Sequence, residues 1–254
     1  MNRAPHTRPI ASTVLLVAII VAGLAVLWHK QVRDHLIPRN FGVVEEGVLY
    51  RSGRLTPRAT RLVVERHAIK TIVDLGAYDK DPDLEEQARR TAEALGVTRY
   101  VFPLHGDGTG NPNAYVAALR VITDPANQPV LVHCSAGAER TSGCVMLYEK
   151  AVHGRAFAET YPLMTRHKHD PARNPLLMSY LADHAGAILA ALRAGTFIDG
   201  YPAPDLAPVR SEYSRDHPAP SPTVETALTL SATPPLPGAA AEPDSPGGTS
   251  TPTP

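Results

Sequence analysis

The chain has 254 residues, of which 43% are hydrophobic, and its 25 basic residues balance 25 acidic ones. This length fits one domain with additional segments, and the zero net charge argues against bulk electrostatic binding to nucleic acid. Its two cysteines, Cys134 and Cys144, exclude a disulfide-rich scaffold and a zinc site of CxxC pairs. His167 and His169 lie in a polar stretch, which we interpret as a solvated basic turn rather than a metal site. We therefore expect no metal, no other cofactor and no nucleic-acid partner.

The start of the chain predicts a membrane anchor. After a short tail at residues 1–9, residues 10–28 (IASTVLLVAIIVAGLAVLW) contain no charged side chain. This length suits a helix that crosses a hydrocarbon core of about 30 Å, and Trp28 would favour the interface. A signal peptide cleaved after the small residues Gly23 and Ala25 is the alternative, but the apolar run continues beyond them. We expect a single-pass membrane protein whose folded domain lies outside the cytoplasm.

Residues 29–39 are interpreted as a linker, and residues 40–195 as one α/β domain. Segments rich in β-branched residues predict strands at residues 47–51, 70–75, 99–104 and 129–133. Helix-forming segments, some bounded by Pro or Gly, predict helices at residues 84–95, 113–123, 141–153, 156–167 and 175–192. The last of the strands is wholly apolar, as in a central parallel strand that is buried on both faces. This order predicts a mainly parallel central sheet flanked by helices on both faces.

Residues 196–254 are interpreted as a disordered, proline-rich tail. Thirteen of the 25 prolines of the chain fall between positions 202 and 254. A segment of this composition buries too little apolar surface to offset the conformational entropy of ordering it.

The segment VLVHCSAGAERT, residues 130–141, predicts a strand, a seven-residue loop and the start of a helix. A loop that enters a helix N-terminus directs several backbone N–H groups to one point, and the helix dipole adds positive potential. Such a loop binds a phosphoryl group. Gly137 permits the tight turn, and Arg140 supplies a planar fork for two phosphate oxygens. The predicted phosphate-binding residues are Ser135, Ala136, Gly137, Ala138, Glu139 and Arg140.

The same positive field favours the thiolate form of Cys134. A thiolate beneath a bound phosphate can attack phosphorus in line and form a phosphocysteine. We expect Thr141 to donate a hydrogen bond to the sulfur when it leaves, and His133 to fix the loop. Cys144 lies one turn inside the predicted helix and is interpreted as a small core residue, with a redox partner as the alternative.

The leaving oxygen needs a proton, and we expect Asp107 to be the general acid. It lies in LHGDGTGN, where glycines on both sides let the loop close over a substrate. Loops that follow parallel strands share one edge of the sheet, so this loop would meet the Cys134 loop. The alternatives are Asp79, Asp81, Asp83 and His105. The three aspartates also read as an ordinary helix entry with an N-cap, and the histidine as a loop-packing residue.

The loop HCSAGAERT resembles the phosphate loop of protein tyrosine and dual-specificity phosphatases. GVLYRSGRLTP and IKTIVDLG resemble the entry strands of the small bacterial and plant-fungal-type dual-specificity group, and the resemblance covers residues 40–185. It implies a compact phosphatase fold, a metal-independent two-step mechanism, and a phosphorylated protein or small phosphate ester as substrate. The chain departs from this group at Gly76, where members often carry Arg, and at Ala138 and Glu139, where some relatives that act on inositol phosphates have Lys. An acid at Glu139 adds negative charge beside the loop, which argues against highly phosphorylated substrates.

Two other functions remain as alternatives. A catalytically idle module would only recognise phosphorylated partners, but binding alone does not need the thiolate of Cys134. The second alternative is sulfur transfer by a rhodanese-like loop, although the active-site loops of that family are usually shorter than this one. The sequence does not select among phosphorylated substrates.

Overall fold

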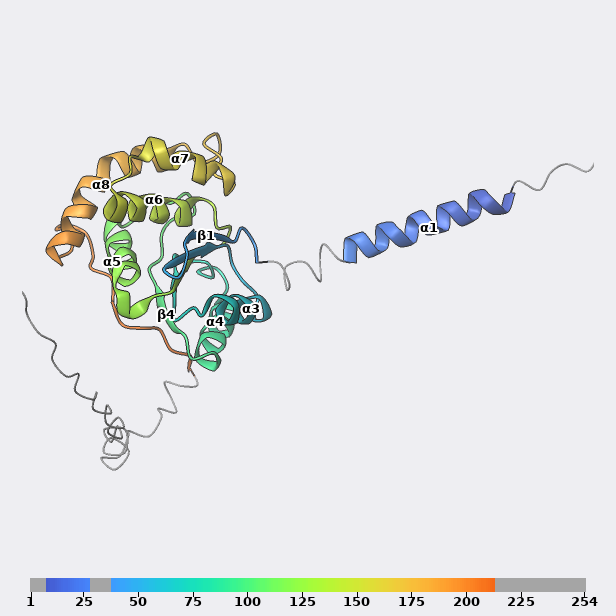
Figure 1. Cartoon of the computed structure of the whole chain (residues 1–254), viewed down its shortest axis with the longest axis horizontal. Helices are drawn as coiled ribbons and strands as arrows, with labels where there is room; N and C mark the ends of the chain where they lie inside the picture. The colour runs from blue at the N-terminus through green and yellow to red at the C-terminus, as the bar shows by residue number, and fades with distance from the viewer. Residues whose placement is uncertain (1–7, 28–37, 213–254) are drawn as a thin grey trace, which may run out of the picture. The chain divides into compact units, whose positions relative to one another are not determined.

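The computed structural model describes residues 8–27 and 38–212, so most of the predicted tail at 1–9 and linker at 29–39 lies outside the described residues. The elements in chain order are α1 (Arg8–Leu27), β1 (Gly42–Glu45), β2 (Leu49–Ser52), α3 (Pro57–His67), β3 (Thr71–Asp74), α4 (Pro82–Ala94), β4 (Thr98–Val101), α5 (Pro112–Thr123), the 3₁₀ turn η2 (Pro125–Asn127), β5 (Val130–His133), α6 (Glu139–His153), α7 (Phe157–Arg166) and α8 (Leu176–Ala194). Strands and helices alternate from β2 to α6 (Figure 1), as expected of an α/β domain.

The sheet is mixed, with strand order β1-β2-β5-β3-β4. The four strands β2, β5, β3 and β4 are parallel to their neighbours, and β1 is antiparallel to β2. This confirms the predicted mainly parallel sheet. His133 is in register with Ser52 on one side and with Asp74 on the other. Three strands therefore end at the same level, and the loops that follow them start from one edge.

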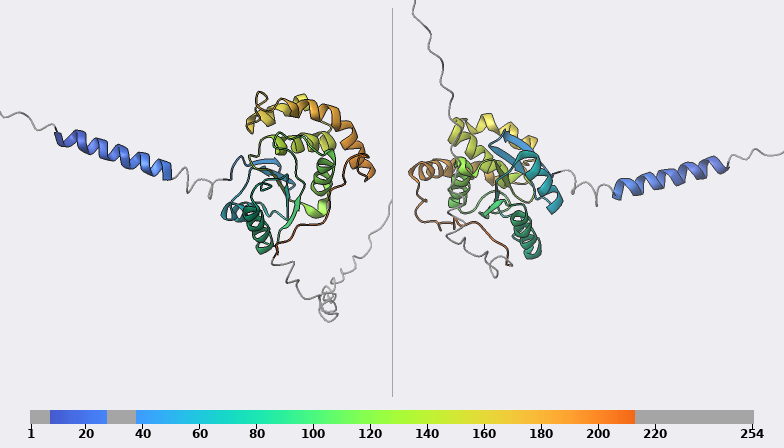
Figure 2. Two further views of the ribbon diagram at one scale, coloured as in Figure 1. Left: turned by 180° about the vertical axis from the view of Figure 1, so that it is seen from behind. Right: turned by 60° about the horizontal axis from the view of Figure 1, so that its bottom comes forward.

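Helices cover both faces of the sheet, as predicted. Helices α5 and α6 lie on one face with α7 and α8 packed against them, while α3 and α4 lie on the other (Figures 1 and 2). Strand residues alternate between the two cores, as a period of two residues requires. On β5, Val130 and Val132 join the core beneath α5 and α6, whereas Leu131 joins the one beneath α3.

Strand β1 and helix α3 were not predicted from the sequence. Thr56 caps α3 by accepting a hydrogen bond from Ala59 N at 3.3 Å, and Pro57 occupies the first turn. Ala59 and Val63 are four positions apart, so they lie on one face and are buried against the sheet. These signals are present in the sequence but are short, and the helix owes its stability to the tertiary contacts of its apolar face.

The structure corrects the prediction of a membrane anchor over residues 10–28. Within the described residues, no helix combines the length and the apolar character needed to span a bilayer. Helix α1 begins at the charged Arg8. The expected membrane partner, single-pass topology and extracytoplasmic placement are corrected with it.

Residues 196–212, here called the C-terminal strap, pack on the domain although the sequence assigned them to the tail. Asn113, which is fully buried on α5, donates to Ile198 O at 3.0 Å and accepts from Ile198 N at 2.8 Å. Further along, Val209 N donates to Arg99 O on β4 at 2.8 Å. The strap is held by hydrogen bonds to its main chain, which its polar, proline-rich composition did not reveal.

Candidate active site

Residues 134–140, which connect β5 to the first turn of α6, form a loop that we call the cradle. Carbonyl groups of the cradle accept hydrogen bonds from donors elsewhere in the domain. The pairs are Arg54 N with Ser135 O (3.0 Å), Asn40 Nδ2 with Ala136 O (3.3 Å) and Arg51 Nη2 with Gly137 O (2.6 Å). Within residues 38–212, Gly137 N is the only amide from Ser135 to Thr141 that donates a hydrogen bond outside the α6 ladder, to Cys134 Sγ at 3.2 Å. The other amides of the loop are available to an anion at the helix N-terminus.

Gly137 is required by the shape of this loop. Its φ is +68°, and a Cβ built there would lie 2.5 Å from Gly53 N and 2.7 Å from the carbonyl carbon of Ser52. Both contacts are with backbone, which cannot move aside as a flexible side chain can. The end of β2 therefore braces the cradle from behind and fixes its curvature.

Cys134 lies at the bottom of the cradle, directly after β5, and only 2% of it is exposed. Thr141, on the first turn of α6, is fully buried, and its Oγ1 has no hydrogen-bond partner among the described residues. Cys144 belongs to the main core cluster, where burial raises the pKa of its thiol to about 12. The interpretation of Cys144 as a core residue is thus confirmed.

Arg140 extends from α6 to the end of β3. Its Nη1 donates to Leu75 O at 2.9 Å and also to Gly76 O. Gly76 has a φ of +86°, and a Cβ built there would lie 2.9 Å from Arg140 Nη1. The glycine at this position, where members of the resembled group often carry Arg, therefore makes room for the guanidinium. Within the described part of the chain, Arg140 Nε has no hydrogen-bond partner.

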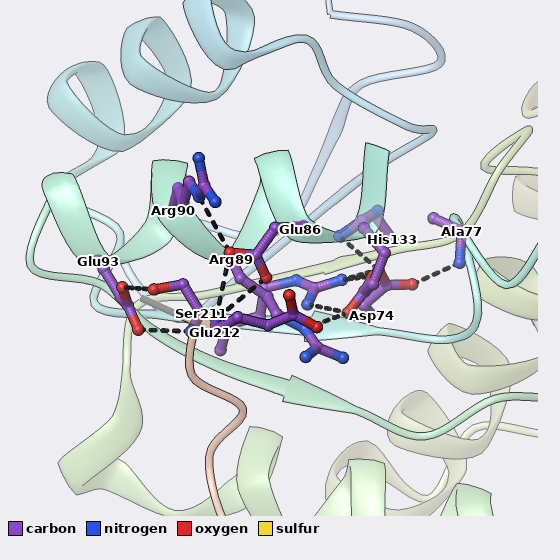
Figure 3. A network of polar contacts seen from close by, with 11 residues as sticks. Asp74, Ala77, Glu86, Arg89, Arg90, Glu93, His133, Ser211 and Glu212 are labelled. Atoms are coloured by element: carbon purple, nitrogen blue, oxygen red, sulfur yellow. Dashed lines mark hydrogen bonds and ion pairs between the residues drawn. The ribbon is translucent and has the colours of Figure 1, made fainter. Parts of the chain in front are cut away.

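His133 lies beside a buried ionic network beneath α4 (Figure 3). Figure 3 shows Ala77 and His133 next to the carboxylate of Asp74, with His133 Nε2 3.7 Å from Asp74 Oδ2. Arg99 donates to the same Asp74 oxygen at 2.5 Å and to Glu85 at 2.7 and 2.8 Å. Burial lowers the pKa of His133, and the charge of Asp74 only partly opposes this. The imidazole is therefore neutral near pH 7.

Asp107 lies in the connection from β4 to α5, in a turn closed by its own side chain. Its Oδ1 accepts from Thr109 N at 3.0 Å and from Thr109 Oγ1 at 2.8 Å. Burial raises the pKa of this carboxyl, but the two hydrogen bonds from Thr109 outweigh it, so the pKa lies below its usual value. The turn lies against the cradle, because a Cβ built on Gly108 would be 3.5 Å from the carbonyl carbon of Glu139.

A cavity of about 240 Å³ opens over the cradle. Its lining comes from the cradle and from the connections that follow β2, β3 and β4: Arg54, Ala77, Tyr78, Asp79, Lys80, Asp81, Gly106, Ser135 and Arg140. Asp79 and Asp81 thus line the cavity, while Asp107 is next to a lining residue. Asp81 is engaged as the N-cap of α4, accepting from Leu84 N at 3.1 Å. The parallel strands bring the predicted acids and the cradle to one edge, as the sequence indicated.

Glu139 does not face the cradle, contrary to the expectation that its charge lies beside the phosphate. Only 7% of it is exposed, and its carboxylate accepts hydrogen bonds from the connection between α7 and α8. The donors are His169 Nδ1, Asn174 Nδ2 at 2.9 Å and Asp170 N at 3.3 Å. His169 is itself 6% exposed, so its interpretation as part of a solvated turn is wrong. A buried carboxylate requires such donors, and this connection supplies them.

Sequence reasoning missed the residues that brace the cradle, chiefly Arg51 and Asn40. Asn40 donates to Gly137 O at 3.0 Å and to His167 O at 2.8 Å, and its φ of +54° is one that Asn tolerates better than most residues. Arg51 occupies a predicted strand in GVLYR, where a charged residue among apolar ones was the available signal. Neither signal identifies its partner, because the contact spans about 86 to 127 positions of sequence.

Comparisons with known proteins identify the family of this chain. The model of a family described as "DSP-PTPase phosphatase fused to NAD+ Kinase" matches residues 28–175. The rice (Oryza sativa subsp. japonica) protein named inositol diphosphatase DSP1 is 34% identical over 116 residues, which are 43% of this chain and 48% of that protein. Arabidopsis thaliana inositol diphosphatase DSP3 is 32% identical over 114 residues, 43% of this chain and 52% of that protein. The chain thus spans about half the length of these relatives.

Two solved structures are similar at low sequence identity. The core catalytic domain of the PP-IP phosphatase SIW14 from S. cerevisiae has a TM-score of 0.49 at 22% identity, covering 63% of this chain and 95% of that one. TpbA of P. aeruginosa has a TM-score of 0.49 at 22% identity, covering 61% of this chain and 91% of that one. The family match extends over more than half of the chain and includes the whole cradle. The chain therefore belongs to the cysteine-based dual-specificity phosphatases, a family of phosphate-hydrolysing enzymes.

Proposed function

We propose that this protein hydrolyses phosphate monoesters through a phosphocysteine intermediate on Cys134. The observation that supports this most is the cradle, whose carbonyls are bound from outside while its free amides lie at the start of α6. An oxyanion at that position is stabilised by backbone dipoles that need no rearrangement. The nearly buried sulfur of Cys134 lies at the base of the same loop.

In the first step, the phosphoryl group binds the loop amides and Arg140. The guanidinium exchanges its contacts with Leu75 O and Gly76 O for phosphate oxygens, which are the better acceptors. The Cys134 thiolate attacks phosphorus as the ester P–O bond breaks. The leaving oxygen takes a proton from Oδ2 of the Asp107 carboxyl, while Thr109 holds Oδ1.

In the second step, water attacks phosphorus and the P–S bond breaks. The Asp107 carboxylate takes the proton that the water loses, and inorganic phosphate is formed. The unpartnered hydroxyl of Thr141 donates a hydrogen bond to the departing sulfur, which leaves as a thiolate. His133, neutral and held beside Asp74, fixes the start of the loop throughout.

The proposed substrates are phosphorylated proteins of the tyrosine or dual-specificity type. Inositol diphosphates are a second candidate, because the rice and Arabidopsis relatives are named inositol diphosphatases. The cavity lining gives this candidate modest support as well, since its cations Arg54, Lys80 and Arg140 outnumber its two acids, Asp79 and Asp81, by one. Glu139 no longer argues against a highly charged substrate, because it is turned away and bound by His169.

Hydrolysis of p-nitrophenyl phosphate in the presence of a chelator tests the mechanism. The wild-type protein should release phosphate, whereas Cys134→Ser should lose turnover and still bind vanadate, because the cradle is backbone plus Arg140. Arg140→Ala should lose both turnover and vanadate binding. Substantial turnover by Cys134→Ser contradicts the covalent mechanism. Binding without turnover by the wild-type protein supports the idle module, and sulfur transfer from thiosulfate supports the rhodanese-like alternative.

A comparison of the specificity constants for two substrates separates the substrate candidates. The ratio kcat/KM is measured for a phosphotyrosine peptide and for a diphosphoinositol phosphate under identical conditions. The charge reversals Arg54→Glu and Lys80→Glu should reduce the value for the inositol substrate more than that for the peptide. An equal effect on both would remove the electrostatic argument for the inositol candidate.

A further inference from the structure

Arg51 on β2 is a buried cation without a carboxylate partner among the described residues. Only 2% of it is exposed, as for Arg99. The two differ in their partners, because Arg99 forms ion pairs with Asp74 and Glu85. Arg51 Nη2 instead donates to Gly137 O at 2.6 Å and to Ser142 Oγ at 3.0 Å, and its Nε has no partner within residues 38–212.

An arginine so placed is costly unless an anion accompanies it. Burial lowers the pKa of Arg51 to about 10, while negative charge on Cys134 or Cys144 raises it, so the guanidinium stays charged at neutral pH. Burial raises the pKa of the Cys144 thiol to about 12, which leaves that sulfur protonated. The anion left for Arg51 is the thiolate that the proposed mechanism places on Cys134, whose Sγ accepts a hydrogen bond from Gly137 N at 3.2 Å.

We propose that Arg51 is the buried counter-ion of the Cys134 thiolate and positions the cradle through the carbonyl of Gly137. The inference rests on the proposed role of Cys134 as the nucleophile. Arg51 and the sulfur contact opposite ends of one residue: Gly137 donates its N–H to Cys134 Sγ at 3.2 Å and accepts from Arg51 through its carbonyl. The positive charge also polarises the peptide that follows, which makes its N–H a better donor to phosphate.

Arg140 and Arg51 thus have different roles in the proposed site. Arg140 has a resting place on Leu75 O and Gly76 O and turns to the phosphate when substrate binds. Arg51 has no such exchange available, because the backbone of the cradle lies between it and the cavity and it is absent from the cavity lining. Its charge therefore acts on the sulfur before substrate arrives, favouring loss of the thiol proton to solvent.

Other titratable groups surround Arg51 and Cys134. His167, at the end of α7, lies beside Arg51, since a Cβ built on Gly42 would be 2.7 Å from the His167 ring and 3.4 Å from Arg51 Cγ. Burial lowers the pKa of His167 to about 4, so it is neutral at pH 7 and supplies no counter-charge. Among the described residues, the titratable groups that interact with Cys134 include Tyr115 on α5, Cys144 on α6 and His133 on β5. Asp74 on β3 lies next to His133, and Arg140 belongs to the cradle itself.

The test is the rate at which iodoacetamide alkylates Cys134 as a function of pH, without substrate. In Arg51→Met and Arg51→Gln, the pH midpoint of alkylation should rise by about one to three units, the effect of a nearby opposite charge. Arg51→Lys keeps the charge and should keep the midpoint, while its kcat falls because Lys cannot hold Gly137 O and Ser142 together. The matched control is Arg120→Met, which removes another arginine bound to a main-chain carbonyl, that of Thr196, and should leave the midpoint unchanged.

Equal midpoints in Arg51→Gln, Arg51→Lys and the wild-type protein would overturn the proposal. If neither neutral variant folds, Ser142→Asp is the substitute, because it introduces a carboxylate at the position that now accepts a hydrogen bond from Arg51. That carboxylate would neutralise the guanidinium, so the pH midpoint of alkylation should rise. An unchanged midpoint there also overturns it. Failure of the proposed function is read separately, from turnover by Cys134→Ser, because alkylation requires no substrate.

Discussion

The carboxylate of Glu139 accepts a hydrogen bond from Asn174 Nδ2 at 2.9 Å, which ties the cradle to the segment just before α8. Glu139 is the residue before Arg140 and the first residue of α6. Its backbone belongs to the phosphate loop, whereas its side chain belongs to the connection between α7 and α8. This contact makes the position of the loop depend on a part of the chain about 35 residues further on.

Glu139→Ala should lower the free energy of unfolding by about 1–3 kcal/mol, because His169 and Asn174 lose their buried acceptor. It should also reduce kcat, since the cradle loses this brace. The measurement is urea unfolding together with turnover of p-nitrophenyl phosphate. Glu65→Ala is the control, because Glu65 forms an exposed pair with Arg61 and should change stability by less than about 0.5 kcal/mol. Equal unfolding midpoints for the two variants would show that the contact carries no stability.

Gly137→Ala should abolish both vanadate binding and turnover. The added methyl would meet the backbone of Ser52 and Gly53 at 2.5–2.7 Å, and neither the cradle nor β2 can yield without breaking the site. Gly154→Ala is a matched control with a φ of +70° and no atom within 4 Å of the added Cβ. It should cost about 1–2 kcal/mol of stability from its backbone conformation alone and leave turnover intact. Isothermal titration with vanadate distinguishes the two, and binding by Gly137→Ala would contradict the packing argument.

Asp107→Asn should slow hydrolysis of an alkyl phosphate far more than hydrolysis of an aryl phosphate whose phenol is acidic. Only the poor leaving group needs a proton from the enzyme. Asp79→Asn is the comparison, because Asp79 also lines the cavity and is the alternative acid. Equal slowing of both substrates by Asp107→Asn would assign Asp107 to structure. The larger leaving-group effect in Asp79→Asn would transfer the role to that residue.

Thr109→Val provides a second test of Asp107 as the general acid. It removes the 2.8 Å hydrogen bond that helps to hold the pKa of Asp107 below its usual value. The pKa should therefore rise, and the protonated acid should persist to higher pH. The alkaline limb of the kcat profile should move to higher pH in the variant. An unmoved limb would mean that another group controls it.

The domain should lose stability as the pH falls from about 6.5 toward 4. Burial lowers the pKa of His133 and of His167, the latter to about 4, from an ordinary value of 6.5. Within this window the unfolded chain binds protons that the folded chain does not, so the free energy of unfolding decreases as the pH drops. Urea unfolding at several pH values measures the slope. His167→Gln should make it shallower, whereas an identical slope would exclude a contribution from His167.

The cradle was predictable because one continuous segment contains it. The residues Cys134 to Arg140, the strand before them and the helix after them carry their own signals in composition and spacing. The position of Glu139 was not predictable, because its partners lie beyond α7 and the sequence shows a carboxylate only as a charge. Arg51 was missed for the same reason. The packing of the C-terminal strap was missed as well, because Asn113 and Arg120, which bind its main chain from α5, look in the sequence like ordinary polar residues of a helix.

The two edge strands of the sheet, β1 and β4, limit further strand pairing in different ways. On β1, the register with β2 shifts between Val43 and Glu45, so the strand is irregular and short. On β4, the strap places Val209 against Arg99 O, so the chain itself occupies part of that edge. Open edges invite the strands of other molecules to add themselves by main-chain hydrogen bonding. Loss of the strap would therefore expose a template for intermolecular strand addition on the side of the domain opposite β1.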